Sequence, residues 1–128
     1  MNLRNRKLVR TIQIILGLYL VLITLAGLFQ LLPPPAFNEA ATAFFTALFN
    51  TGYIMPLMQI VFVAAGLMFI FNKWSAFGAV LLAPITVNIL AFHVFLDITG
   101  WWMALIFAIL HIYLLIIHGP RYKIMFKK

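Results

Sequence analysis

Four long apolar stretches alternate with short polar segments along the chain, and this alternation predicts the fold. The stretches cover residues 11–32, 54–71, 76–96 and 101–118. Each is about 20 residues long, the length that an α-helix needs to cross a hydrocarbon core of roughly 30 Å. A basic segment precedes the first stretch, as in a signal peptide, but the apolar core of a signal peptide is only about 7–15 residues. We therefore expect the first stretch to be a retained span.

The segment between the first two stretches, residues 33–53, predicts an additional short helix. The prolines at 33–35 are expected to end the first span, because proline cannot continue a helix. Asn38 can cap a new helix at about 38–50, and Glu39 in its first turn suits the helix dipole. The aromatic residues and alanines of this helix favour a position at the membrane interface or partly between the spans. The predicted fold is all-α: a membrane four-helix bundle with a short interfacial or re-entrant helix between the first and second spans.

Charged residues sort to opposite sides of this predicted bundle. Four spans place both termini and the turn at 72–75 on one side, and that side holds all nine Lys and Arg residues. The two acidic residues, Glu39 and Asp97, fall on the other side. Because cytoplasmic loops carry an excess of Lys and Arg, we expect both termini to be cytoplasmic. The basic excess thus indicates topology and does not indicate nucleic-acid binding.

Composition supports a single integral membrane domain over residues 1–128. The hydrophobic fraction is 66% and the charged fraction 9%, against roughly 45–50% and 25% in soluble domains. A soluble fold of this size could not bury so much apolar surface. The chain has no cysteine, which excludes disulfides, thiol chemistry, thiolate metal sites and haem attachment through cysteine. The sequence also lacks a Ser/His/Asp set, paired carboxylates and a phosphate-binding loop.

Polar side chains inside the apolar stretches are the candidate ligand-binding residues. They are Asn88, His93, His111, Gln59 and Thr86. Asn88 and His111 each lie roughly 14–15 Å from the outer ends of their helices, so we expect them to share a layer near the midplane. His93 and Gln59 lie roughly 6 Å deep, and Thr86 falls on the His93 face. Ionisable residues inside spans are functional candidates by default, and Gln59 would close the outer side of such a pocket.

Structural explanations remain open for the same residues. Asn88 could satisfy backbone groups that the expected kink at Pro84 releases, or it could join two helices. His93 could form a hydrogen bond with Asp97 or Gln59 near the membrane edge. These alternatives require no ligand.

The other histidine combinations point away from metal or haem. His118 is expected to be an interfacial residue, since it lies at the basic end beside Arg121. His93 and His111 differ in depth by roughly 9 Å, which disfavours a bis-histidine haem. A metal cluster would need more histidines or carboxylates than the spans supply.

Two segments resemble the DoxX-like family of small bacterial membrane proteins. They are "TGYIMPLMQIVFVAAGLMFIF" at 51–71 and "LLAPITVNILAFHVFLD" at 81–97. The resemblance covers the order of elements from the first span to the fourth, and it implies a DoxX/DoxD-like bundle in a bacterial inner membrane. Many relatives carry a glutamate in the second helix where this chain has Gln59, so no acid–base role is implied there. The family name derives from a thiosulfate:quinone oxidoreductase, which implies an oxidoreductase-associated subunit, although the absence of cysteine excludes a thiol–quinone mechanism.

Two functions remain open at this point. The first is an accessory membrane protein, rather than a stand-alone enzyme, that binds a small lipophilic molecule such as a quinone within the bundle. That ligand would arrive from the outer side or laterally from the lipid. The second is a structural or assembly subunit without a ligand, whose outer helix at 38–50 docks a membrane-protein partner or a second copy of the chain. A transporter is disfavoured, because four spans without a repeat would need an oligomer to build a pathway.

Overall fold

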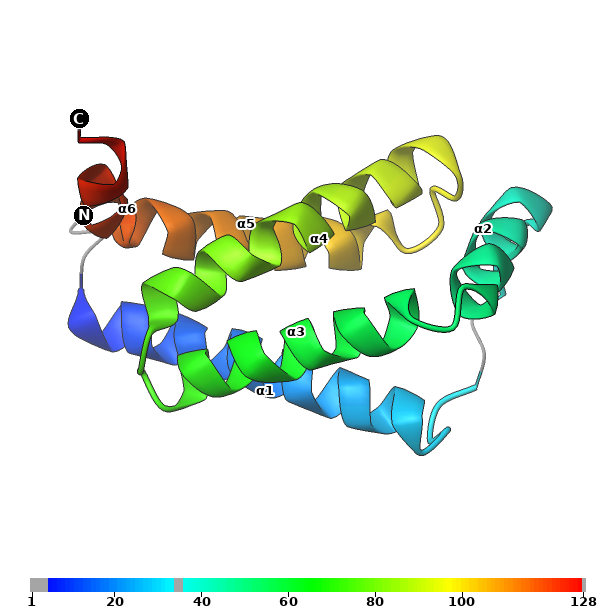
Figure 1. Cartoon of the computed structure of the whole chain (residues 1–128), viewed down its shortest axis with the longest axis horizontal. Helices are drawn as coiled ribbons and strands as arrows, with labels where there is room; N and C mark the ends of the chain where they lie inside the picture. Colours follow the sequence, from blue (N-terminus) through cyan, green and yellow to red (C-terminus); the bar gives the residue numbers. More distant parts are fainter. Residues whose placement is uncertain (1–4, 34–35, 128) are drawn as a thin grey trace.

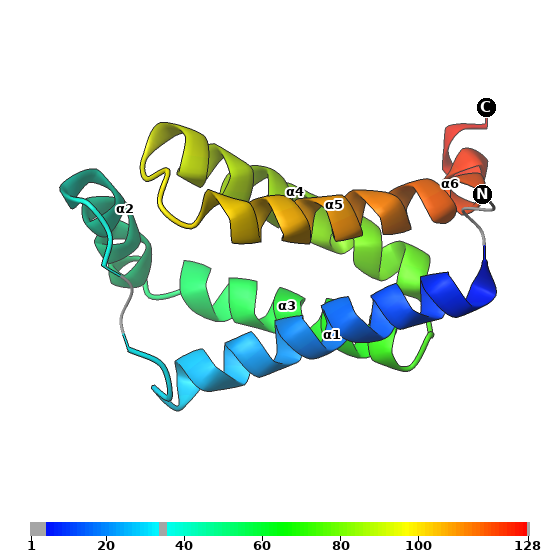
Figure 2. The same ribbon diagram turned by 180° about the vertical axis from the view of Figure 1, so that it is seen from behind.

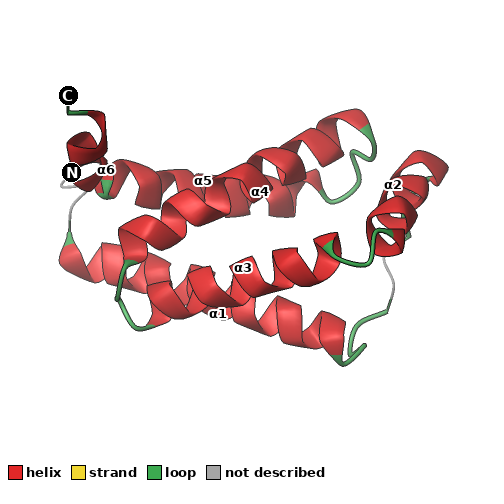
Figure 3. Cartoon of the chain, viewed as in Figure 1, coloured by secondary structure: helices red, strands yellow, loops and turns green. Residues whose placement is uncertain are grey.

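Four helices pack side by side into an elongated antiparallel bundle, with a fifth helix across one end (Figure 1). The computed structural model describes residues 5–33 and 36–127. No strand occurs within these ranges (Figure 3). The prediction of an all-α bundle with a short extra helix between the first two long ones is confirmed. In chain order the elements are α1 (Arg6–Leu28), α2 (Glu39–Asn50), α3 (Ile54–Ile70), α4 (Ser75–Phe95), α5 (Trp101–Ile117), α6 (Gly119–Tyr122) and the 3₁₀ turn η1 (Lys123–Phe126).

Two to four of the helical segments are candidate membrane spans. By length and composition, α1 and α4 can each cross a membrane alone. α3 follows α2 at a bend of 89°, and the segment after α5 turns away from it by 60°. The number of spans rises to four if each bent pair counts as one. The chain is therefore a helical membrane protein, and both of its termini lie at the same end of the bundle (Figures 1 and 2).

The first helix differs at both ends from the predicted range 11–32. α1 begins at Arg6, because the Asn5 side chain accepts the N–H of Lys7 at 3.0 Å and caps the first turn. The basic flank of the first span is thus part of the helix. The other helices agree with the predicted ranges to within one residue at each end.

α1 ends at Leu28 because the backbone after it turns into a left-handed conformation. Gln30 has φ 54°, and the N–H of Leu31 reaches back to the Ala26 carbonyl at 2.9 Å. This is the hydrogen bond of a Schellman motif, a common way for a helix to end. The helix therefore stops before Pro33, and the prediction that the prolines end it is wrong. Pro34 and Pro35 lie outside the described residues.

α1 and α3 form the most extensive helix pair, and two glycines set the distance between their backbones. A Cβ atom added to Gly17 would lie 2.6 Å from the Gly66 carbonyl oxygen. A Cβ added to Gly66 would lie 2.9 Å from the Gly17 carbonyl oxygen. Small residues permit such backbone contact between membrane helices, whose association depends on packing. The core beside this crossing is made by buried side chains from all four long helices: Leu16, Leu20, Ala65, Phe69, Ala79, Leu82, Phe107 and Leu114.

Alanine at Gly17 is expected to lower the free energy of unfolding by about 1–3 kcal/mol, the usual cost of overpacking. Gly27→Ala on the same helix is the matched control, because nothing lies within 4 Å of a Cβ at that position. That control should be neutral or stabilising by up to about 1 kcal/mol, through helix propensity. Unfolding in detergent, followed by far-ultraviolet circular dichroism, measures both variants. Equal stabilities would contradict the proposed backbone contact.

Candidate functional site

The structure does not bring the predicted ligand-binding residues together, and Asn88 lies on the outside. Asn88 is exposed on α4 and donates from Nδ2 to the Pro84 carbonyl at 3.0 Å. The prediction that Asn88 lines the interior is therefore wrong. The structural alternative fits better, since the amide is satisfied one turn back on its own helix. α4 continues from Ser75 to Phe95 without a break at Pro84.

Thr86 and Gln59 are also separate from a common site. Thr86 is buried, and its hydroxyl donates to the Leu82 carbonyl at 3.4 Å on the same helix. Gln59 is partly exposed on α3, and its side chain forms no hydrogen bond with the described residues. Neither residue therefore supplies a polar group to a shared pocket.

His93 lies in the last turn of α4 and is bonded to the turn that follows it. Its Nδ1 lies 3.0 Å from the backbone carbonyl oxygen of Asp97. Because a carbonyl only accepts, Nδ1 is the donor in this hydrogen bond. Asp97 was one of the two expected partners of His93, but the contact is made by its backbone and not by its carboxylate.

His111 is buried in the middle of the bundle, but it does not lie level with Asn88. It is 1% exposed, and its Nε2 donates to the Ala79 carbonyl at 2.7 Å. His111 is thus level with Ala79, and the predicted shared layer with Asn88 is wrong. The depth estimate assumed that α4 ends where α5 begins, whereas α4 extends past the start of α5 (Figure 1). Nδ1 of His111 is buried without a hydrogen-bond partner among the described residues.

An apolar groove opens between α1 and α5 and has a volume of about 210 Å³. These two helices contact each other less extensively than the pairs α1–α3 and α4–α5, which leaves the space. The Phe107 ring lines the groove and also lies near His111, which is not part of the lining. The Phe107 ring centroid lies 6.0 Å from that of Tyr19 and 6.3 Å from that of His111. The groove is lined by Ile15, Leu16, Tyr19, Trp102, Met103, Ile106, Phe107 and Leu110.

At the end of the bundle opposite the termini, hydrogen bonds of Asn38 and Asp97 fix α2 across the turn between α4 and α5, and we call these bonds the outer clamp. Asn38 caps α2 as predicted, since its Oδ1 accepts the N–H of Ala41 at 2.8 Å. The Asn38 backbone N–H donates to Asp97 Oδ2 at 2.9 Å, and its side-chain amide donates to the Leu96 carbonyl at 2.5 Å. Thr99 donates its N–H to Asp97 Oδ1 at 2.9 Å. These hydrogen bonds, first that from Asn38 and then those from Thr99, hold the pKa of Asp97 below its ordinary value.

Phenylalanine rings fill the space beneath this outer clamp. Phe92 of α4 packs edge-on against Phe37 and Phe45, with ring centroids 5.3 and 5.2 Å apart. Phe44 of α2 approaches the same ring at 5.9 Å. α2 therefore rests on the end of α4 through aromatic packing, and it lies across the bundle end.

At the opposite, basic end the structure contains a buried polar network that sequence reasoning missed. Gln13 is 1% exposed, and its Nε2 donates to Asn72 Oδ1 at 2.8 Å and to Ser75 Oγ at 3.2 Å. Gln13 Oε1 lies 3.3 Å from His118 Nε2, so that nitrogen carries a hydrogen. His118 is 7% exposed and connects the end of α5 to α1 through Gln13, so the expectation of a merely interfacial residue is wrong. The available signal was the polar residue Gln13 within the first apolar stretch.

Arg10 adds a second tie between α1 and the end of α3. Its Nη1 donates to the Phe69 carbonyl at 2.8 Å, and its Nη2 donates to the Ile70 carbonyl. The last carbonyls of a helix lack intrahelical partners and favour a nearby cation. The turn that follows holds Asn72 and Trp74 in left-handed conformations, with φ values of 51° and 60°. The hydrogen bonds of Arg10 and Gln13 therefore stabilise a turn whose backbone conformation is rare for residues other than glycine.

Neither a metal site nor a similar protein indicates what this arrangement of residues does. The described ranges contain no group of three or more His, Cys, Asp or Glu side chains that could hold a metal ion. No family model, curated protein or solved structure matches the chain. The function must therefore be inferred from the arrangement of the residues.

Replacing Asp97 by asparagine is expected to loosen α2 at neutral pH, because the carboxylate that receives the Asn38 and Thr99 N–H groups is lost. Since the chain has no cysteine, spin labels at Thr46→Cys and Ile109→Cys report the distance from α2 to α5. The distance distribution should broaden in Asp97→Asn and stay narrow in the control Glu39→Gln. An unchanged distribution in Asp97→Asn would show that the clamp does not position α2.

The same label pair is expected to show an acid transition in the wild-type protein. The folded-state pKa of Asp97 is lowered, so its contribution is complete above the unfolded value of about 3.9 and is lost as the pH falls through the folded value. The distribution should remain narrow at pH 5 and broaden only below about pH 4. Asp97→Asn should lack this transition.

Proposed function

We propose that the chain is an accessory, DoxX-like integral membrane protein that binds a small lipophilic molecule, such as a quinone, in the groove between α1 and α5. The observation that carries this proposal is the apolar groove with a phenol and an indole at its wall. Small-molecule sites combine an apolar lining with a few polar groups that fix orientation. Tyr19 and Trp102 supply those groups here.

The size of the groove limits what it encloses. Its volume of about 210 Å³ is below the roughly 300–1,000 Å³ of sites that enclose a whole drug-sized ligand. One ring of a head group therefore fits, and an isoprenoid tail would lie along the lipid-facing surface. This arrangement supports lateral arrival from the lipid. It also moves the proposed site away from Asn88, His93, Gln59 and Thr86.

Polar groups near the groove match the hydrogen bonds of a quinone and its reduced form. The Tyr19 hydroxyl can donate to a quinone carbonyl, which only accepts. His111 Nδ1, the buried nitrogen without a partner, can accept from a quinol hydroxyl once the Phe107 ring turns aside. His111 is thus the one member of the predicted residue set that remains in the proposal.

We also propose that the protein resides in a bacterial inner membrane with both termini in the cytoplasm. Charge sorting supports this orientation, because the basic termini and the Lys73 turn share one end of the bundle. Glu39 and Asp97 lie at the other end, at the start of α2 and in the turn before α5. Positive loops remain on the cytoplasmic side.

A second candidate function is assembly of a membrane complex through α2. The outer clamp holds this helix rigidly across the bundle end, where its outward face carries a shallow hollow. Such a face could receive a membrane-protein partner or a second copy of the chain, with no ligand in the groove. The hollow is lined by Phe37, Glu39, Thr42, Ala43, Thr46, Ala47 and Asn50.

Filling the groove is expected to weaken quinone binding if the first proposal is right. Ile106→Trp places an indole in the groove and should weaken binding about tenfold or more, since overpacking costs about 1–3 kcal/mol. Ile109→Trp is the matched control, because Ile109 lies on the same helix outside the groove and is equally exposed, 57% against 53% for Ile106. Tyr19→Phe should weaken binding by roughly two- to tenfold through one lost hydrogen bond.

Binding of a radiolabelled short-chain quinone to the protein in detergent, corrected with protein-free micelles, provides the measurement. Equal binding by Ile106→Trp and Ile109→Trp, or no binding by the wild type, would reject the groove as a quinone site. Either result would favour the assembly function.

A further inference from the structure

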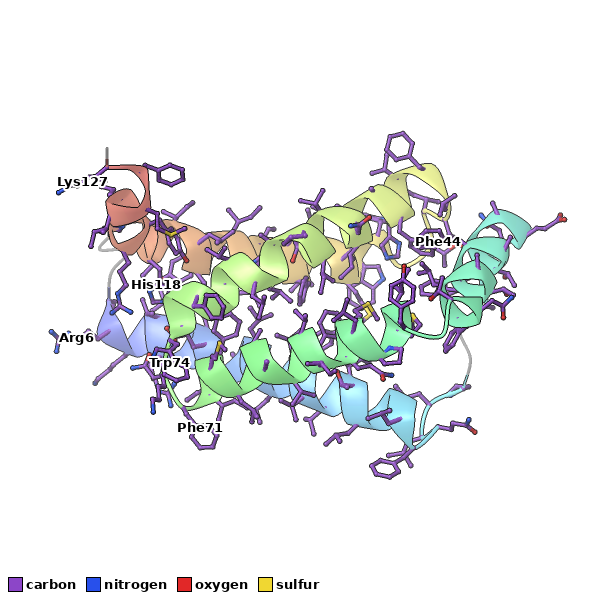
Figure 4. All side chains as sticks on the ribbon, viewed as in Figure 1. Arg6, Phe44, Phe71, Trp74, His118 and Lys127 are labelled. Atoms are coloured by element: carbon purple, nitrogen blue, oxygen red, sulfur yellow. The ribbon has the colours of Figure 1, made fainter. Side chains whose placement is uncertain are left out.

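A second and larger hollow lies at the basic end of the bundle, between the start of α1 and the end of α5. Its volume is about 910 Å³. Figure 4 shows Arg6 and His118 at this end, near the two termini. The positively charged side chains that line it come from two separate segments: Arg6, Lys7 and Arg10 from α1, and Arg121 from α6.

No acidic side chain is among the described residues that line this hollow. The two acidic side chains of the sequence, Glu39 and Asp97, lie at the start of α2 and in the turn before α5, at the other end of the bundle. The start of α1 adds the positive end of a helix of 23 residues. The hollow therefore has a positive potential from side chains and backbone together, and an anion would relieve the repulsion among its walls.

The floor of this hollow is built from fixed groups. Arg10 is held by its bonds to the Phe69 and Ile70 carbonyls, and an arginine retains further N–H donors after two are used. His118 is held by Gln13. By contrast, the side chains of Arg6, Lys7 and Arg121 form no hydrogen bond with the described residues. A floor of fixed groups with three unengaged cations around it is suited to a tetrahedral anion.

Topology alone does not account for this arrangement. The positive-inside rule requires basic residues on this side, but it does not require that four of them line one hollow. Lys123 and Lys127, in the C-terminal segment, also satisfy this rule, yet they lie outside the hollow. The apolar side chains of Val9 and Ile117 also contribute to the wall. The hollow thus combines cations with an apolar border at the level of a helix end, where lipid head groups lie.

We propose that this basic hollow binds the phosphate group of an anionic phospholipid. The phosphate contacts Lys7, Arg10 and Arg121, and the first carbons of the acyl chains lie against the apolar border. Basic pockets between membrane helices on the cytoplasmic side are suited to such head groups. This site is separate from the groove between α1 and α5 and does not depend on the function proposed for it.

The test compares two double variants that remove the same charge from the same end of the protein. Lys7→Gln with Arg121→Gln changes the hollow, whereas Lys123→Gln with Lys127→Gln changes the tail outside it. Neither pair includes a side chain that holds the helices together, and far-ultraviolet circular dichroism confirms folding. The apparent affinity for phosphatidylglycerol and for phosphatidylcholine is measured by native mass spectrometry of the detergent-solubilised protein.

The wild type is expected to bind one phosphatidylglycerol molecule in preference to phosphatidylcholine. The hollow variant should lose about tenfold in affinity for phosphatidylglycerol, whereas the tail variant should change by about twofold or less. Equal losses in both variants would indicate diffuse surface attraction and overturn the proposal. The absence of any preference for the anionic lipid in the wild type would do the same.

Inorganic phosphate separates a lipid site from a site for a free anion. Phosphate added to the protein in detergent is expected to displace phosphatidylglycerol only weakly, because it lacks the acyl chains that contact Val9 and Ile117. If inorganic phosphate raises the thermal stability as much as phosphatidylglycerol does, and displaces the lipid at similar concentration, the hollow is a free-anion site. The lipid assignment would then be wrong.

Discussion

The backbone contact between Gly17 and Gly66 is the constraint on which the other features of the bundle depend. Lipid does not drive two apolar helices together as water does, so α1 and α3 must associate through close packing and polar ties. With no Cβ at either position, the two backbones meet. Arg10 and Gln13, one to two turns before Gly17, then come within hydrogen-bonding distance of the last carbonyls of α3 and the turn after it. A larger residue at the crossing would separate both polar ties as well.

This tight pair also explains why the groove lies where it does. α1 is drawn toward α3 through small residues, and its contact with α5 is correspondingly less extensive. The space that results is filled on one side by Phe107 and bordered by Tyr19, and it is not closed by a polar contact. The close α1–α3 contact can thus keep the shape of the bundle, while the looser α1–α5 contact leaves a lateral groove that admits a flat molecule.

The sequence predicts the helices well because their ends carry strong local signals, such as Asn38 before α2 and the glycine and tryptophans around the start of α5. It predicts the candidate site poorly, because depth along a helix does not determine which way a side chain points. α4 is apolar on almost all sides, so its pattern does not distinguish the face that carries Asn88 from the buried face that carries Thr86. The level of His111 depends on the offset between α4 and α5, which the five-residue turn between them (96–100) does not specify.

Most polar side chains in the described structure form hydrogen bonds with backbone carbonyls. Which carbonyl each one binds distinguishes the residues that hold the helices together from a residue that remains available to a ligand. Arg10, Asn38 and His111 each bond a carbonyl of a distant segment, and these bonds hold the ends and the middle of the bundle. Asn88 and Thr86 bond carbonyls of their own helix and hold nothing else. His111 differs from all of them, because its second nitrogen is buried and has no partner within the described residues. A buried acceptor without a hydrogen bond costs the folded state about 1–3 kcal/mol. A ligand hydroxyl that donated to this nitrogen would remove that cost, and the gain would add to the binding free energy.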